Sequence, residues 1–306
     1  MTVTETPTPQ PVTSDGDTMS GFLFALTAYL LWGFLPLFMK LLSHIPALEV
    51  VAHRVLWSVP IAGVVLLIMG RTADLKVALR TPRMMAMGAL TASIISVNWL
   101  IYVWAITHNH SLEAAFGYYI NPLLSIALGA VVLKEKLHPL QIAAIALAFV
   151  AVGILTWEMG GVPWVSVGLA VSWAFYAYLR KTLPVGPNQG FLLEVLILLP
   201  AALAYVVYLS LAGESHFGTV NLYDAAILMA TGIVTAGPLM IYANGAKRLK
   251  LSTIGIMQYI APTIIFLLAV FIFREPFSAT KLMAFALIWL ALVLYTLQMF
   301  RGRRRR

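Results

Sequence analysis

Apolar residues run along this chain in stretches long enough to cross a lipid bilayer, and short polar connections separate them. A spanning helix needs ~20 mostly apolar residues, because the hydrocarbon core is about 30 Å thick. The stretches that meet this requirement cover residues 21–41, 47–69, 84–106, 111–133, 139–157, 163–181, 190–212, 222–245, 251–273 and 279–300. The pattern predicts an all-α integral membrane protein with ten transmembrane helices and no separate soluble domain.

Composition leads to the same class of protein. The chain is 61% hydrophobic and 10% charged, whereas soluble domains carry about 25% charged residues. It has no cysteine, which excludes disulfides, thiolate metal sites and cysteine nucleophiles. The net charge of +8 would suit a nucleic acid, but the basic residues lie in short connections and in a tail at 301–306. We therefore expect the lipid bilayer, and no nucleic acid, as a partner.

The distribution of Lys and Arg predicts the orientation. If the N-terminus is cytoplasmic, the connections on that side hold 16 Lys and Arg residues and those on the other side hold three. Cytoplasmic connections carry such an excess. We expect both termini in the cytoplasm, with residues 1–20, which are rich in Thr and Pro, as a disordered tail and residues 301–306 as a basic tail.

An internal repeat relates the two halves of the chain. Tyr-Ile-Asn-Pro at 119–122 recurs as Tyr-Ile-Ala-Pro at 259–262, an offset of 140 residues. The same offset relates Lys134-Glu135 to Arg274-Glu275 and Pro60 to Pro200. Apolar helices can resemble one another by composition alone, but one constant offset favours duplication. Because five spans is an odd number, the sequence predicts two inverted five-helix repeats, residues 21–158 and 159–300.

Ionisable residues within the predicted spans are few, and each costs roughly 2.5–3.5 kcal/mol to insert. The interior set consists of Glu49, His53, Arg54, Glu113 and Glu194. Glu49 and His53 are four residues apart and share a helix face, whereas Arg54 points about 140° away from Glu49 at ~100° per residue. The repeat offset makes Glu194 the equivalent of Arg54.

These residues carry the substrate and coupling hypotheses. Arg54 contacts an anionic substrate group or neutralises a carboxylate, and Glu113 or Glu194 titrates during transport. The alternatives are a buried structural ion pair, or charged groups that reach the interface from near the span ends.

Two prolines and several polar or aromatic residues lie near mid-span. Interrupted helices at matching positions of two repeats indicate a midplane binding site, which makes Pro122 and Pro262 candidate hinges. Packing kinks are the alternative for the prolines, and interfacial belts or core packing for the aromatic rings. The candidate binding residues at this depth are Asn98, Trp99, Tyr119, Asn121 and Tyr259.

No pattern predicts a metal, a cofactor or a catalytic centre. His108 and His110 lie in one connection without a carboxylate or cysteine partner, a weak metal signal. There is no Walker loop, so transport would be secondary. A membrane-embedded enzyme would need a nucleophile and base together, and the dispersed Glu49, His53 and Glu113 do not provide them.

Several motifs resemble the RarD branch of the EamA family, in the drug/metabolite transporter superfamily. They are Asn98-Trp99-Leu100, Leu112-Glu113-Ala114, the run Gly117–Leu123, His53-Arg54-Val55 and Gln258-Tyr259-Ile260, and the resemblance covers residues 20–300. It implies ten helices in two EamA repeats, a bacterial inner membrane and transporter activity, without naming a substrate.

Together these observations predict a secondary active transporter. It would move a small organic metabolite or drug-like solute by alternating access, with proton coupling as a hypothesis. The alternative is a membrane-embedded protein that does not transport, either an enzyme or a signalling component.

Overall fold

All regular structure in the described residues is helical. The computed structural model describes residues 18–303 except 71–72, 133–137, 183, 219–220, 247 and 250–256. The helices are α1 Met19–Leu41, α2 Ala47–Ile68, α3 Ala73–Arg80, α4 Pro82–Thr107, α5 Ser111–Val132, α6 Pro139–Met159, α7 Trp164–Thr182, α8 Pro187–Ala212, α9 Leu222–Ala246, α11 Ile260–Leu267, the π-helix η1 Leu268–Ile272, and α12 Ala279–Arg303.

Six of these helices are long and apolar enough to cross a membrane by themselves. They include residues 19–41, 47–68, 82–107, 139–159, 188–212 and 222–242. Large apolar side chains on them, such as Phe149, Trp157 and Leu211, are exposed in the isolated chain, as expected where lipid replaces water. The expectation of an all-helical membrane protein is confirmed.

The observed helix ends follow proline and glycine. Pro82, Pro139 and Pro187 occupy the first positions of α4, α6 and α8, where a missing N–H breaks no helical hydrogen bond. Gly160 and Gly213 end α6 and α8 with φ of 65° and 73°, a left-handed conformation that glycine adopts without a side-chain clash.

Two segments differ from the sequence prediction. The short helix α3 lies in the connection between α2 and α4, where no helix was expected. Its apolar and charged residues lie on different faces over only eight positions, too few for the span criterion to register. The predicted span 251–273 begins in residues outside the described ones, and its described part is α11 followed by η1.

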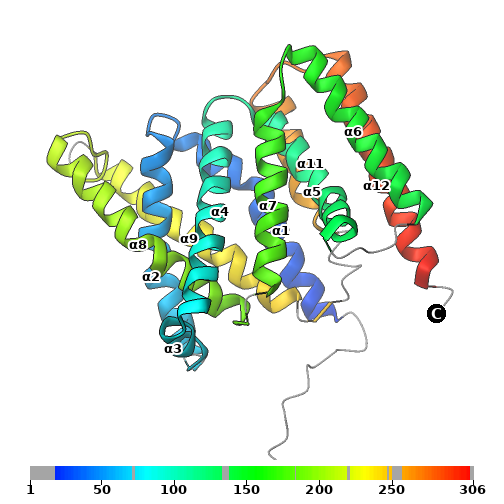
Figure 1. Ribbon diagram of the computed structural model, residues 1–306. Helices are drawn as coiled ribbons and strands as arrows, with labels where there is room; N and C mark the ends of the chain where they lie inside the picture. The colour runs from blue at the N-terminus through cyan, green and yellow to red at the C-terminus, as the bar shows by residue number, and fades with distance from the viewer. Residues whose placement is uncertain are drawn as a thin grey trace, which may run out of the picture.

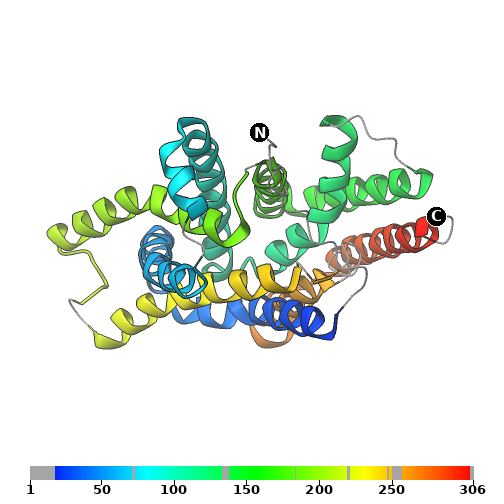
Figure 2. The same ribbon diagram turned by 90° about the horizontal axis from the view of Figure 1, so that it is seen from below.

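The helices pack mainly against partners distant in sequence (Figure 1). Helix α1 lies along α9, and α2 lies along both α8 and α9. Helix α7 contacts α4 and α5, and α11 contacts α1 and α5. Helices α6 and α12 lie side by side at one edge of the molecule, and both contact α5 (Figures 1 and 2).

The connections at one end of the helices form the upper end, named for its orientation in Figure 1. It consists of residues 42–46, 108–110, 160–163, 213–218 and 273–278. The opposite end, which includes α3, is called the lower end. Most contacts described below lie at the upper end or in the helices just beneath it.

Candidate functional site

Arg54 lies inside the bundle, where three helices besides its own converge on it. Its side chain projects from α2 and is 4% exposed. The Nε–H donates to the hydroxyl of Thr235 on α9 at 3.0 Å. The guanidinium carbon lies 4.9 Å from the ring centre of Trp99 on α4, within the range of a cation–π contact. These two contacts fix the direction of the guanidinium.

The hydroxyl of Thr235 is committed to receiving this hydrogen bond. Its own proton goes to the carbonyl oxygen of Thr231 at 2.7 Å, one helical turn earlier in α9. Only lone pairs therefore remain for the Arg54 Nε–H. The backbone of α9 thus orients the hydroxyl, and the hydroxyl orients Arg54.

Two buried polar groups beside Trp99 have no hydrogen-bond partner among the residues that the structure describes. They are Nη1 of Arg54 and the phenol oxygen of Tyr102 on α4. The Tyr102 ring lies 5.9 Å from that of Tyr118 on α5, and both phenols are near enough to interact electrostatically with Arg54. We call Arg54, Trp99, Tyr102, Tyr118 and Thr235 the Arg54 cluster. It presents unused donors in an otherwise apolar region.

Among the described residues no carboxylate forms an ion pair with Arg54. The buried carboxylates all contact other groups: Glu49 meets His216, Glu194 meets Tyr176, Asp224 meets His44 and Glu275 meets the start of α5. Arg54 therefore forms no structural ion pair with a described carboxylate, whereas Glu49 and Glu113 each contact a histidine.

Glu49 and His53 face one connection, as their spacing predicted. The Glu49 carboxylate accepts the backbone N–H of His216 at 2.8 Å, and its second oxygen lies 2.7 Å from the ring Nδ1. The His53 ring packs 5.0 Å from that of Phe217, the next residue. Trp57 donates its indole N–H to Nδ1 of His53. These residues join α2 to the connection between α8 and α9.

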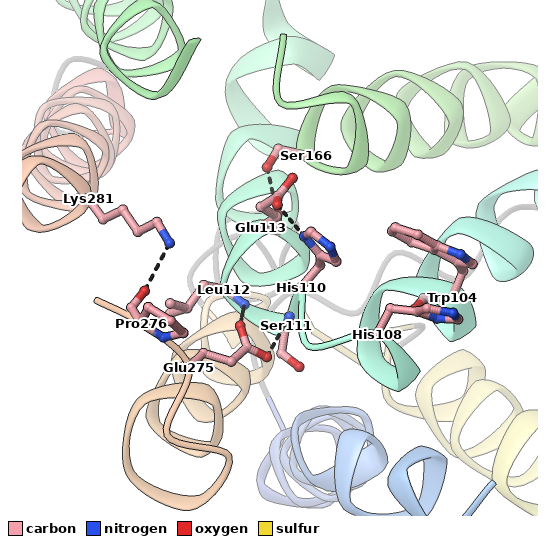
Figure 3. A network of polar contacts seen from close by, with 10 residues as sticks. All are labelled: Trp104, His108, His110, Ser111, Leu112, Glu113, Ser166, Glu275, Pro276 and Lys281. Atoms are coloured by element: carbon pink, nitrogen blue, oxygen red, sulfur yellow. Dashed lines mark hydrogen bonds and ion pairs between the residues drawn. The ribbon is translucent and has the colours of Figure 1, made fainter. Parts of the chain in front are cut away.

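Glu275 caps helix α5 at the upper end (Figure 3). Its two oxygens accept the backbone N–H groups of Ser111 and Leu112 at 2.8 and 2.9 Å, so two of the otherwise unbonded N–H groups of α5 are satisfied. The preceding residue, Arg274, has φ of 53°, and this turn directs Glu275 toward α5. Glu275 thus makes a helix-end contact, whereas Lys134-Glu135, its equivalent by the repeat offset, lies outside the described residues.

Glu113 belongs to the same upper-end network and not to the Arg54 cluster. One carboxylate oxygen lies 2.6 Å from Nδ1 of His110, and its backbone carbonyl accepts the Ser166 hydroxyl at 2.8 Å (Figure 3). Its other carboxylate oxygen is buried and has no hydrogen-bond partner within the described residues. His110 and His108 both stack on Trp104. No group of three or more metal-ligating side chains occurs in the part of the chain that the structure describes.

Asn98 and Glu194 make contacts to helix α7. The Asn98 side-chain amide donates to the Leu169 carbonyl at 3.2 Å and to the Ser172 hydroxyl at 2.8 Å. The Tyr176 hydroxyl donates to Glu194 at 3.0 Å. The structure therefore separates the neighbours Asn98 and Trp99: Asn98 faces α7, and Trp99 faces Arg54.

The remaining candidates lie where α5 meets α11. The Thr263 hydroxyl donates to the Tyr259 carbonyl, so the Tyr119 hydroxyl donates to Thr263, at 2.7 Å. The rings of Tyr119 and Tyr259 lie 6.4 Å apart. Buried Asn121 lies on α5 beside Pro122.

The two candidate hinge prolines occupy different local structures. Helix α5 continues through Pro122. Pro262 lies in the first turn of α11, directly after a turn at residues 258–259. Proline fits a first helical turn without loss of a hydrogen bond. The interruption in this segment therefore precedes Pro262.

Sequence reasoning missed Thr235 and His216. Each lies more than 160 residues from its partner, Arg54 or Glu49, and no local pattern links them. A Thr pair spaced four residues apart, Thr231 and Thr235, was the available signal for a polar stripe on α9.

Comparison with known proteins gives a consistent result. Residues 19–157 match the model of the EamA-like transporter family. The chain is 41% identical to the protein RarD of Streptomyces exfoliatus over 95% of this chain and 93% of the relative. It is 41% identical to an uncharacterized transporter of Vibrio cholerae over 92% of this chain and 93% of the relative. A solved crystal structure with 22% identity covers 91% of this chain and 98% of its own with a TM-score of 0.59, which supports the fold.

Proposed function

The chain belongs to the EamA-like transporter family, in its RarD branch, and on this premise we propose that it is a secondary transporter that moves a small organic solute by alternating access. We propose further that it has ten spanning helices in two inverted repeats, residues 21–158 and 159–300. Its membrane would be the bacterial inner membrane, with both termini and the lower end in the cytoplasm.

The observation that carries the mechanism is an exchange pattern in the helix packing. In the proposed repeats α1, α2, α4, α5 and α6 correspond to α7, α8, α9, α11 and α12. Under that exchange the α1–α9 contact becomes α7–α4, and the α5–α7 contact becomes α11–α1; all four contacts are present. The pairs α2–α8, α5–α11 and α6–α12 map onto themselves.

Such a pattern suits a protein with two states of similar energy. If each repeat can adopt the arrangement of the other, the molecule opens to one side or to the other with little change in total packing. The described conformation would be the one closed at the upper end. Breakable polar contacts gather there between the proposed repeats: His44–Asp224, Glu49–His216, Glu275 with Ser111 and Leu112, and Glu158–Ser278.

We propose in addition that proton entry drives transport, because the membrane potential supplies enough free energy. One charge that moves through 100 mV releases ~2.3 kcal/mol, enough to sustain a roughly fortyfold solute gradient, since each tenfold step needs ~1.4 kcal/mol. Glu194, buried at 1% exposure, is the candidate carrier. Solute flux in proteoliposomes that persists after the pH gradient is collapsed would exclude this part.

The natural absence of cysteine permits a test without a known substrate. Ser58 is fully buried on α2, one turn beyond Arg54, and Ser58→Cys changes one atom. A membrane-impermeant maleimide would be applied to right-side-out spheroplasts and, separately, to inside-out vesicles. Alternating access predicts modification from both sides, faster from the lower side; modification from one side only, or from neither, would contradict it.

Two exposed positions provide the controls and test the topology. Ser43→Cys, in an upper connection, should react only from the periplasmic side, and Leu79→Cys, on α3, only from the cytoplasmic side. Mapping that puts residues 134–136 and 274–275 on the same side of the membrane would overturn the inverted repeat. If the protein is instead a non-transporting enzyme or signalling component, Ser58→Cys should be modified from at most one side of the membrane.

A further inference from the structure

We propose that the transported solute is an organic carboxylate, and that its carboxylate is the missing counter-charge of Arg54. This inference rests on the proposed transport function and adds the chemical class of the substrate. It depends on one observation: a buried guanidinium that is held in place by neutral groups and keeps an unpaired N–H direction.

The first step is charge balance. A cation within a membrane protein is costly unless it is paired or faces water. The buried carboxylates among the described residues contact other groups, and the cluster around Arg54 consists of an indole, two phenols and a hydroxyl, all neutral. The Arg54 cluster therefore holds one positive charge in excess, and an anion that enters restores neutrality.

The second step is geometry. The Nε–H of Arg54 donates to Thr235 and the guanidinium face contacts Trp99, while Nη1 has no hydrogen-bond partner in the described part of the chain. The buried Tyr102 hydroxyl, which likewise has no partner among the described side chains and backbone groups, can donate a hydrogen bond. Two donors from α2 and α4 suit an acceptor with two oxygens, and a carboxylate is such a group.

The third step is preorganisation. Because Thr235 and Trp99 already orient the guanidinium, an arriving anion pays little entropy to order it. Thr235 is thus a positioning residue, whereas Arg54 and Tyr102 would touch the substrate. The rings of Trp99 and Tyr118 offer apolar surface to the remainder of the solute. A carboxylate with an apolar or aromatic body fits this arrangement better than a small inorganic anion.

Thermal unfolding of the purified full-length chain in detergent tests this inference. The probes are benzoate, phenylacetate and lactate, each compared with its neutral amide in a buffer of constant chloride. Ligands that bind the folded state raise the unfolding midpoint, by about 2 °C at ten times the dissociation constant for a chain of this size. We expect at least one carboxylate to raise the midpoint and its amide to leave it unchanged.

Substitutions assign the effect to the site. Arg54→Met should abolish the carboxylate-induced shift of the unfolding midpoint. Arg54→Lys should retain a smaller shift, because lysine keeps the positive charge but lacks the planar guanidinium that can donate two parallel hydrogen bonds. Thr235→Val should raise the carboxylate concentration needed for half the shift severalfold. Arg83→Met removes a charge from an exposed position on α4 and should leave the response intact.

Several results would overturn the inference: equal shifts by the amides, an unchanged response in Arg54→Met, or no shift by any carboxylate in the unmodified protein. If Arg54→Met does not fold, the Arg54→Lys and Thr235→Val responses decide, and unchanged responses in both overturn it. A shift produced by chloride alone would also do so. The transport proposal is tested separately, because Ser58→Cys can react from both sides of the membrane whatever the substrate class.

Discussion

Gly232 of α9 lies against the backbone of Trp57 in α2 so closely that a Cβ at Gly232 would come within 2.4 Å of the Trp57 carbonyl carbon. One turn away on each helix, Thr235 receives the hydrogen bond from Arg54. The close approach of these two helices therefore sets the distance across which Arg54 is held.

Gly232→Ala should separate the two helices and destabilise the protein by about 1–3 kcal/mol, as overpacking against a backbone does. Gly237→Ala is the matched control, since it lies on the same helix and no described atom outside its own turn of α9 comes within 4 Å of its Cβ position. It should be neutral or stabilising by about 0.5–1 kcal/mol. Denaturation in detergent measures both. Equal effects of the two substitutions would show that the contact is not tight.

Glu49→Gln and His216→Asn should weaken the upper end. Each removes one side of a buried carboxylate–imidazole contact of 2.7 Å, and the upper-closed state would lose about 1–3 kcal/mol. In the Ser58→Cys background we expect maleimide modification to become several times faster from the upper side and slower from the lower side. Both changes must occur together, because the two states share one equilibrium. Faster reaction from both sides would indicate general loosening instead.

Glu275→Ala should expose two buried N–H groups at the start of α5 and reduce the free energy of unfolding by about 1–2 kcal/mol. Glu275→Gln retains one acceptor and should cost less. Glu214→Gln removes a similar charge from an exposed position of the upper end and should have no measurable effect. Thermal unfolding of the three variants in one detergent checks the order; a Glu214 effect as large as that of Glu275→Ala would contradict the cap.

Asn98→Leu should destabilise the protein by about 0.5–2 kcal/mol, because the hydrogen bonds to Leu169 and Ser172 join α4 to α7. It should leave the carboxylate-induced shift of the unfolding midpoint unchanged. Loss of that shift with normal stability would move Asn98 from a structural role to a binding role.

Much of the fold could be predicted from the sequence, because the length and periodicity of its apolar stretches indicate the helices. Apart from α3 and the segment that leads into α11, apolar stretches located the described helices to within a few residues. The helical repeat also separated the face of Glu49 and His53 from that of Arg54. Those predictions succeed because burial in lipid requires uninterrupted apolar helices, and because side-chain direction follows from residue number within a helix.

The partners of these side chains could not be predicted in the same way. His216 lies in a connection and Thr235 on a helix that is far away in sequence, so their contacts depend on how helices cross. The contacts of Glu113 could not be predicted either, because its place at the upper end, away from Arg54, depends on where α5 begins. The small residue at Gly232, which permits the α2–α9 contact, looks like any other glycine of an apolar span.

The pairing of α6 with α12 joins the helix that ends the first proposed repeat to the one that ends the second. This contact links the two proposed repeats at the side opposite to α8 (Figure 1). A rearrangement that exposes Arg54 must then either rotate about the α6–α12 contact or move both helices together as one rigid body. Substitutions that weaken the packing of α6 on α12 would therefore change the equilibrium between the two conformations without altering any contact to the solute.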